Sequence, residues 1–141
     1  MKWVTWENIG IDRMACAWLI QRQIDPAAEV TFVPAGHDLP QGYEPFDIPG
    51  VRLSHRRGHC TFHTMLQDYK LDDPVLAQIA AIVDEADMAQ DITLEPAAAG
   101  LDLICRGMRL ISTDDLIAVE RGCLIYDALY AQLKAQQGGQ S

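Results

Sequence analysis

The residues best suited to chemistry lie in one segment, His55-Arg-Arg-Gly-His59-Cys60-Thr-Phe-His63, which holds three of the four histidines within nine residues. Imidazole and thiolate groups at short spacing are ligands that Zn²⁺, Fe²⁺ and Ni²⁺ select. Gly58 disfavours a helix through the whole segment, so we expect His55 at the end of a strand and His63 in the first turn of a helix. Ligands placed on either side of the loop could converge on one metal ion. The alternative is a solvated loop that happens to be rich in histidine.

A second group of candidate ligands is acidic. Asp84, Glu85 and Asp87 lie within four positions of one another, near the end of an expected helix. Asp84 and Asp87 are three residues apart, share a helix face and could chelate one cation. Val83 and Ala86 should face the core, so at least one of the two carboxylates should lie near a buried edge, where an unpaired charge is costly. The alternative is an exposed acidic helix end.

Two cysteines are candidate redox thiols, Cys16 and Cys60. Cys16 follows the start of an expected helix, where the positive end of the helix dipole and the nearby Arg13 would favour the thiolate. Asp12 could cap the same helix. The alternative for Cys16 is a small core residue among apolar neighbours.

Three arginines, Arg13, Arg56 and Arg57, could together bind an oxyanion through bidentate contacts, unless Arg13 pairs with a carboxylate. The chain has no Ser-His-Asp order, glycine-rich phosphate loop or dinucleotide fingerprint. Its net charge is −9, and residues 71–141 hold 12 acidic and only 4 basic side chains. A nucleic-acid partner is therefore disfavoured. We expect a small oxyanion or a metal ion as the ligand, with a protein partner or a homo-oligomer also open.

The helices and strands expected around these residues indicate an α+β fold that is predominantly helical. In the N-terminal half we expect a small sheet of about three short strands, at residues 2–5, 30–33 and 51–54, with a helix over residues 11–24. A strand, a helix and a strand in this order predict a crossover unit with parallel strands. Residues 34–50 contain four prolines and three glycines, which is typical of a long irregular loop.

The C-terminal half is predicted to be helical. Thr61 could cap a helix over residues 61–69, and Pro74 should open a helix that ends near Asp87 or Met88. Pro96 should open the next helix, and Ser112 with Asp115 could cap the last one, in which Gly122 is an expected weak point. The expected buried stripes of these two helices are Leu101, Ile104, Cys105 and Met108, and Leu116, Val119, Cys123, Tyr126, Tyr130 and Leu133.

Length and composition predict one globular domain over residues 1–137, followed by a frayed tail at 138–141. The chain has 141 residues, of which 49% are hydrophobic and 22% charged. Its apolar runs are far shorter than the ~20 residues that span a bilayer, so we expect no membrane partner. The first residues lack the apolar run of a secretory peptide. We therefore expect a cytoplasmic protein with reduced thiols.

Several segments, in order along nearly the whole chain, resemble one known family. They are Trp-Val-Thr at 3–5, Ile-Asp-Arg-Met-Ala-Cys-Ala-Trp-Leu-Ile at 11–20, Ile-Asp-Pro-Ala-Ala-Glu at 24–29, Pro-Phe-Asp-Ile-Pro-Gly-Val at 45–51, His-Arg-Arg-Gly-His-Cys-Thr-Phe at 55–62, Pro-Ala-Ala-Ala-Gly-Leu at 96–101 and Tyr-Asp-Ala-Leu-Tyr at 126–130. Together they resemble the ChrB C-terminal domain family, which is associated with bacterial chromate resistance.

The resemblance also bears on the candidate ligands. In the family pattern an acidic residue stands at the place of His63, and a histidine often stands at the place of Asp84. Both positions thus exchange one kind of metal ligand for another. The resemblance therefore implies a divalent transition metal, zinc, iron or nickel, at His55, His63, Asp84 and Asp87.

The function implied by the resemblance is a metal-binding role in sensing or detoxification during chromate or oxidative stress. Two alternatives stay open. One is a metal-dependent enzyme, a reductase or a hydrolase, in which an open coordination position activates water or an oxyanion. The other is a metal-free interaction module that partners a regulator or a rhodanese-like sulfurtransferase.

Overall fold

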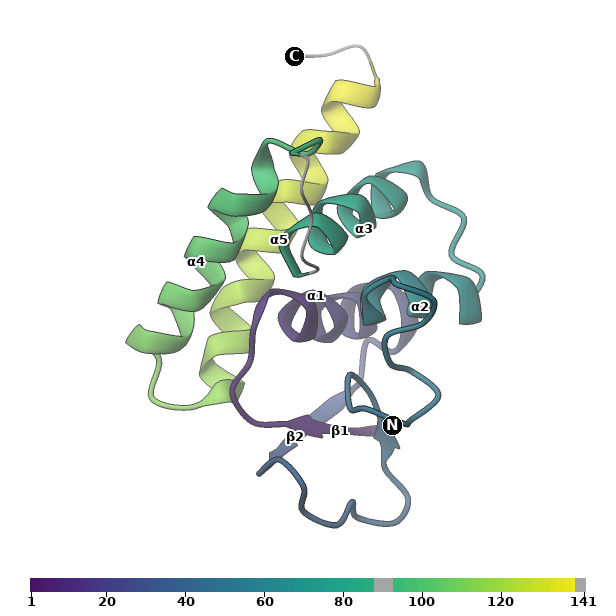
Figure 1. Ribbon diagram of the computed structural model, residues 1–141, viewed down its shortest axis with the longest axis vertical. Helices are drawn as coiled ribbons and strands as arrows, with labels where there is room; N and C mark the ends of the chain where they lie inside the picture. The colour runs from purple at the N-terminus through teal and green to yellow at the C-terminus, as the bar shows by residue number, and fades with distance from the viewer. Residues whose placement is uncertain (88–92, 139–141) are drawn as a thin grey trace.

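A computed structural model describes residues 1–87 and 93–138 of the chain (Figure 1). A small sheet and the helix α1 lie at the bottom and centre of this view, and the helices of the C-terminal half lie above and beside them. The elements, in chain order, are β1 (Lys2–Trp6), α1 (Ile11–Leu19), η1 (Ile20–Ile24), β2 (Glu29–Val33), β3 (Glu44–Pro45), α2 (Thr61–Asp68), α3 (Pro74–Asp87), α4 (Ala97–Ile111) and α5 (Asp115–Gln137). The predicted α+β class, mostly helical with a small N-terminal sheet, is confirmed.

The expected crossover unit is present. Strands β1 and β2 are parallel, with Lys2 opposite Glu29 and Trp6 opposite Val33, and the helical segment α1–η1 connects them. The helix covers the full predicted range, but its last turn, η1, is a π-helical turn in which the Asp25 amide donates to the Ile20 carbonyl at 2.7 Å. Only residues 7–10 separate β1 from α1, so the start of α1 lies just beyond the end of β1.

The third strand lies where a loop was predicted. Strand β3 pairs in parallel with β1, with Trp3 opposite Glu44 and Val4 opposite Pro45, and the sheet order is β2-β1-β3. A proline is tolerated there because β3 is an edge strand and needs no amide on its outer side. The expected strand at 51–54 is wrong: within it, Leu53 forms an isolated bridge to Phe46. Leu53 is fully buried. The alternation of apolar and polar residues at 51–54 therefore reflects the burial of one side of a loop, and not a paired strand.

Helix α1 is the centre of the core. Eight of its nine residues are buried, and Arg13 is the exception. The helix packs against α2, α3, α4 and α5, and Trp18 stacks on Phe62 and Tyr126 with ring centroids 6.4 and 5.8 Å away. Aromatic pairs at these separations stabilise beyond the area that they bury. The buried side chains of α1, Asp12 among them, are therefore held in place by core packing.

Three predicted details of the last two helices are wrong. On α4 the buried residues are Ala98, Leu101 and Cys105, whereas Ile104 is 51% exposed. On α5, Leu116 of the predicted stripe is 45% exposed. Helix α5 is capped by Asp114, whose Oδ1 accepts from the Ile117 amide at 2.9 Å. Asp115 instead accepts from the amides of Asn8 and Ile9, both at 3.2 Å. It thus ties the start of α5 to the loop between β1 and α1. The predicted frayed tail at 138–141 lies outside the described residues from 139 on, and so does Met88.

The outer face of α4 is unusually apolar. Its exposed large side chains are Leu103, Ile104, Leu110 and Ile111, on the side of the molecule where α4 lies in Figure 1. Across residues 1–87 and 93–138, however, none of the helices combines the length and the hydropathy that crossing a membrane requires.

Gly122 is a close contact between α5 and α1, and α5 continues through it without a break. A Cβ at this position would overlap Sδ and Cγ of the buried Met14. We expect Gly122→Ala to lower the free energy of unfolding by about 1–3 kcal/mol through overpacking, measured by urea denaturation. Gly107→Ala on α4 is the matched control. A Cβ there meets nothing within 4 Å, so helix propensity should leave that variant unchanged or more stable by up to about 1 kcal/mol. Equal effects of the two substitutions would contradict the packing argument.

Candidate functional site

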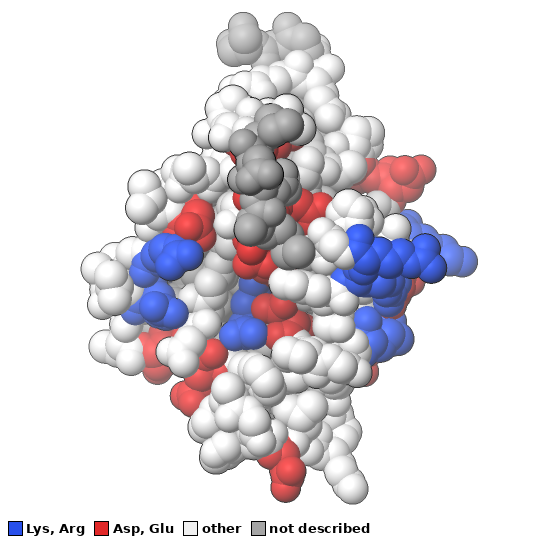
Figure 2. Space-filling view, in the orientation of Figure 1, with Lys and Arg blue, Asp and Glu red and all other residues white. Residues whose placement is uncertain are grey.

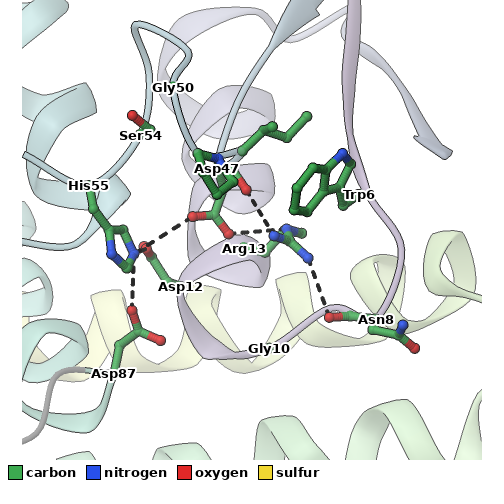
Figure 3. A pocket seen from close by; sticks show the side chains of 12 residues that line it. Trp6, Asn8, Gly10, Asp12, Arg13, Asp47, Gly50, Ser54, His55 and Asp87 are labelled. Atoms are coloured by element: carbon green, nitrogen blue, oxygen red, sulfur yellow. Dashed lines mark hydrogen bonds and ion pairs between the residues drawn. The ribbon is translucent and has the colours of Figure 1, made fainter. Parts of the chain in front are cut away.

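Three side chains from distant parts of the sequence meet at one point (Figure 3). His55 Nε2 lies 3.0 Å from Asp12 Oδ2 and 3.1 Å from Asp87 Oδ2. Asp12 comes from the first turn of α1, His55 from the loop before α2, and Asp87 from the end of α3. Each offers one ligand atom, and the three atoms lie within 4.8 Å of one another. We call these three residues the acidic cluster.

Asp12 is the buried and most firmly held member of the acidic cluster. Its residue exposure is 2%. Its carboxylate accepts hydrogen bonds from the amides of Thr61 at 2.8 Å and Phe62 at 3.0 Å. It therefore caps the N-terminus of α2 from another helix, and the helix dipole of α2 favours its negative charge. The predictions that Asp12 caps its own helix and that Thr61 caps α2 are both wrong. The α1 N-cap is Gly10, and the α2 N-cap Cys60 makes no side-chain cap bond.

Asp47 and Arg13 form the next layer around the acidic cluster. Asp47 Oδ1 lies 3.8 Å from His55 Nε2 and accepts from the Thr61 hydroxyl at 2.7 Å. Its Oδ2 lies 3.0 Å from Arg13 Nε. The Arg13 guanidinium also donates to the backbone carbonyls of Asp47 at 2.8 Å and Glu7 at 3.2 Å. Arg13 thus holds the loop that carries Asp47 against the start of α1.

The acidic cluster and Asp47 are rich in negative charge, and this charge helps to raise the pKa values of His55, Asp47 and Asp87. The hydrogen bond to Asp12 raises the pKa of His55 to about 9, with further contributions from Asp47 and Asp87. Desolvation raises the pKa of Asp47 to about 7, and the charge of Asp12 adds to this shift. The pKa of Asp87 is raised for the same two reasons. At neutral pH the His55 ring is therefore protonated, and its positive charge lies between the carboxylates of Asp12 and Asp87.

The acidic cluster opens onto a pocket of about 600 Å³. The pocket is also lined by Trp6 at the end of β1, by Asn8 in the loop that follows, by Ile48 and Pro49, and by Ser54. In Figure 3, Trp6 lies beside the Arg13 guanidinium, across the pocket from His55. In Figure 2, acidic side chains gather near the centre of the face on which α4 lies to the left and α2 to the right. The site is thus a hollow whose lining combines acidic side chains with the apolar Trp6, Ile48 and Pro49.

The four predicted metal ligands fall into two pairs. His55 and Asp87 belong to the acidic cluster. Asp84 instead bonds His59, with Oδ2 2.7 Å from His59 Nδ1, while its Oδ1 accepts from the Cys60 amide at 2.7 Å. The ring of His63 stacks on that of His59, with centroids 3.9 Å apart. The structure thus brings His55 together with Asp87, and places His63 beside the Asp84–His59 pair.

The two candidate redox thiols are buried, and the pKa of Cys16 shifts in the direction opposite to that expected. Burial raises the pKa of Cys16 well above its ordinary value, and the charge of Asp12 adds to the shift. Cys16 Sγ donates to Asp12 Oδ1 at 3.6 Å. Burial and the charge of Asp12 also raise the pKa of Cys60. The expectation that Arg13 and the dipole of α1 favour a Cys16 thiolate is therefore wrong, because burial disfavours the thiolate and the neighbouring Asp12 carboxylate adds to this effect. We expect both native thiols to react slowly with a disulfide reagent such as DTNB.

The three predicted anion-binding arginines have different surroundings. Arg13 lines the pocket and pairs with Asp47, whereas Arg56 Nη1 lies 3.0 Å from Asp68 Oδ1 on α2. Arg57 is exposed, and its backbone φ is 54°. Among the described residues, no hydrogen bond or ion pair joins the three arginines into one site. Arg56 instead fastens the loop that carries His55 to α2.

Asp68 holds that loop through a second ion pair as well, in which Arg52 Nη1 lies 2.8 Å from Asp68 Oδ2. Its hydrogen bond to Arg56 lowers the pKa of Asp68. A carboxyl group whose pKa is lowered by folding stabilises the protein above its unfolded pKa, and this contribution is lost as the pH falls through the lower folded pKa. We therefore expect Asp68→Asn to be less stable than wild type at pH 7, with the difference vanishing below about pH 3. Urea denaturation from pH 2 to pH 7 measures this. The exposed Asp72→Asn is the control, and a pH-independent difference for Asp68→Asn would contradict the ion-pair origin.

The fold and the site define a small, mostly helical α+β domain whose central helix carries a buried carboxylate into an acidic pocket. The chain belongs to the ChrB C-terminal domain family: the family model described as "ChrB, C-terminal domain" matches residues 3–133. Among curated proteins, Protein ChrB of Cupriavidus metallidurans is 29% identical over 136 residues, which cover 95% of this chain and 41% of that protein. The chain therefore spans less than half the length of this relative. No solved structure gives a significant match.

Asp12 is the site residue that sequence reasoning missed as a ligand. The available signal was its position on the core side of α1, one helical turn before Cys16, where a carboxylate without partners would be costly. Asp47, which follows Phe46 in the expected loop, carried no comparable signal. Its role depends on contacts with residues 34 and 14 positions away.

Proposed function

We propose that this domain binds one divalent transition metal ion at Asp12, His55 and Asp87, and that it serves in the response to chromate or oxidative stress that its family resemblance implies. The observation that carries the proposal is the convergence of three ligand atoms, from three elements, within 4.8 Å. His63 and Asp84, which were expected in the same set, lie in the neighbouring His59 group and are left out of the proposed ligand set.

The charges around the acidic cluster support a divalent ion. Three carboxylates, those of Asp12, Asp47 and Asp87, face Arg13 and His55. With His55 protonated, all three carboxylates ionised and no metal, these groups sum to a formal charge of about −1. A divalent ion that replaces the imidazolium proton brings the sum to about zero. Metal binding would therefore relieve the repulsion by Asp12, which adds to the effect of burial in raising the pKa values of Asp47 and Asp87.

The donor set supports a transition metal. One imidazole nitrogen with two carboxylate oxygens suits zinc, iron or nickel, whereas an all-oxygen set would suit magnesium or calcium. The amides of Thr61 and Phe62 orient the Asp12 carboxylate, as outer hydrogen bonds commonly orient metal ligands. Three protein ligands leave at least one coordination position for water or another ligand, which is typical of catalytic rather than structural sites.

The pocket favours a second candidate function, that of a metal-dependent enzyme. The acidic cluster forms one wall of a 600 Å³ hollow, so a small molecule in the pocket would reach the open coordination position. A metal ion in such a position activates water or polarises a bound group. Turnover that is lost on chelation and restored by the metal would support a hydrolase or a reductase over a sensing role.

Elemental analysis by plasma mass spectrometry tests the metal proposal. We expect near-stoichiometric zinc, iron or nickel in untagged wild type and in His37→Ala, since His37 lies in an exposed turn away from the pocket. The His55→Ala and Asp87→Ala variants should lose the metal. His63→Ala should retain it, which separates the acidic cluster from the His59 group. A metal-free wild type that refuses added Zn²⁺, Fe²⁺ and Ni²⁺ would overturn the proposal and favour a metal-free interaction module.

A further inference from the structure

We propose that the pocket beside the acidic cluster takes a planar organic monocarboxylate, whose acid group binds the metal ion and whose flat body packs against Trp6. This inference rests on the metal binding proposed above. It names the ligand class of the same pocket and replaces the small oxyanion expected from the three arginines.

The size of the pocket favours an organic molecule. Its volume of about 600 Å³ falls within the range of roughly 300–1,000 Å³ that is usual for small-molecule sites. A tetrahedral oxyanion consists of one central atom and its oxygens, and it would leave most of this space to water. A ring system with an acid group would fill much more of the pocket.

The lining of the pocket combines two kinds of chemistry. It includes the acidic cluster and Asp47, and it also includes Trp6, Ile48 and Pro49. Figure 3 places Trp6 across the pocket from His55. Trp6 is partly buried at the end of β1, and its ring lies along the pocket in Figure 3. Aromatic side chains bind flat apolar groups by stacking and by edge contacts. The pocket therefore matches a ligand with one polar end and one planar apolar end.

The positive charge available to a ligand is limited. Arg13 and His55 carry the cationic groups among the lining residues. Arg13 already contacts Asp47 Oδ2, the Asp47 carbonyl and the Glu7 carbonyl, and His55 is a proposed metal ligand. The metal ion is thus the single point at which a negative group would bind. With the metal bound and the carboxylates ionised, the surrounding formal charges sum to about zero. A monoanion then leaves less excess negative charge in the pocket than a dianion such as chromate or sulfate, and is favoured.

Isothermal titration calorimetry on zinc-loaded protein tests the inference, with metal content measured on the same samples. The probes are benzoate, 2-naphthoate, acetate, sulfate and molybdate. We expect benzoate and 2-naphthoate to bind at least about tenfold more tightly than acetate, and to be displaced by neither sulfate nor molybdate. Trp6→Ala should weaken benzoate binding about tenfold without loss of zinc, and Trp6→Phe should restore most of the affinity.

The outcomes separate the two proposals. Zinc-loaded protein that binds sulfate or molybdate more tightly than benzoate overturns the inference and leaves the metal site intact. An unchanged benzoate affinity in Trp6→Ala overturns it in the same way. Wild type that holds no zinc and binds no benzoate overturns the metal proposal, and the inference with it.

Discussion

Asp12→Ala is expected to lower the free energy of unfolding of the metal-free protein by about 3 kcal/mol. The substitution leaves the buried amides of Thr61 and Phe62 without their acceptor, and each unsatisfied buried donor costs about 1–3 kcal/mol. Relief of the repulsion between Asp12 and the carboxylates of Asp47 and Asp87 offsets part of this loss. Urea denaturation followed by far-ultraviolet circular dichroism measures the difference.

Asp87→Ala is the matched control for this prediction. Asp87 contacts His55, and among the described contacts its carboxylate accepts from no backbone amide. Its removal should change the stability of the metal-free protein by less than about 1 kcal/mol. Asp12→Asn should fall between the two variants, because it keeps one carbonyl oxygen for one amide. If Asp12→Ala proved as stable as Asp87→Ala, the Asp12 carboxylate would not be holding the start of α2.

Zinc is expected to stabilise the wild-type protein by about 2.7 kcal/mol when its free concentration is a hundred times its dissociation constant. The reason is that the three ligand atoms come together only in the folded chain, so the ion binds the native state in preference to the unfolded one. At the same zinc concentration, Asp87→Ala should show no stabilisation. Urea denaturation in buffered zinc measures the free energy of unfolding of wild type and of Asp87→Ala, and a chelator should reverse the effect of zinc.

Two controls make this second prediction specific. His37→Ala should respond to zinc as wild type does, because His37 lies outside the pocket. A zinc response in Asp87→Ala equal to that of wild type would contradict the acidic cluster as the binding site. If that response then disappeared in His63→Ala, the His59 group would be the site instead.

Local patterns in the sequence were enough to predict most of the fold. The crossover from β1 through α1 to β2 followed from two apolar runs on either side of a helix, and Pro74 and Pro96 marked where α3 and α4 begin. The third strand was missed because Glu44–Pro45 is too short to show alternation. Its pairing with β1 is a contact between residues about forty positions apart, and such contacts leave no local signal.

The candidate site was predicted in part for the same reason. His55 and Asp87 were singled out by residue type, and the structure brings them together. Their partner Asp12 was interpreted as a local cap of its own helix, whereas it caps α2, 49 and 50 positions further on. The sequence also suggested that Asp84 and Asp87 share one ion, because they share a helix face. In the fold each faces a different histidine of the same loop, His59 and His55.

The separation along the chain of Asp12, His55 and Asp87 has a consequence for the kinetics of folding. Contacts between residues far apart in sequence must overcome a larger loss of chain entropy, so on average they form later than local helices and crossovers. An interaction that is absent from the folding transition state changes the unfolding rate and leaves the folding rate nearly unchanged. A metal ion held by these three residues would then mainly lower the unfolding rate. It would lengthen the lifetime of the folded domain and leave the folding rate nearly unchanged.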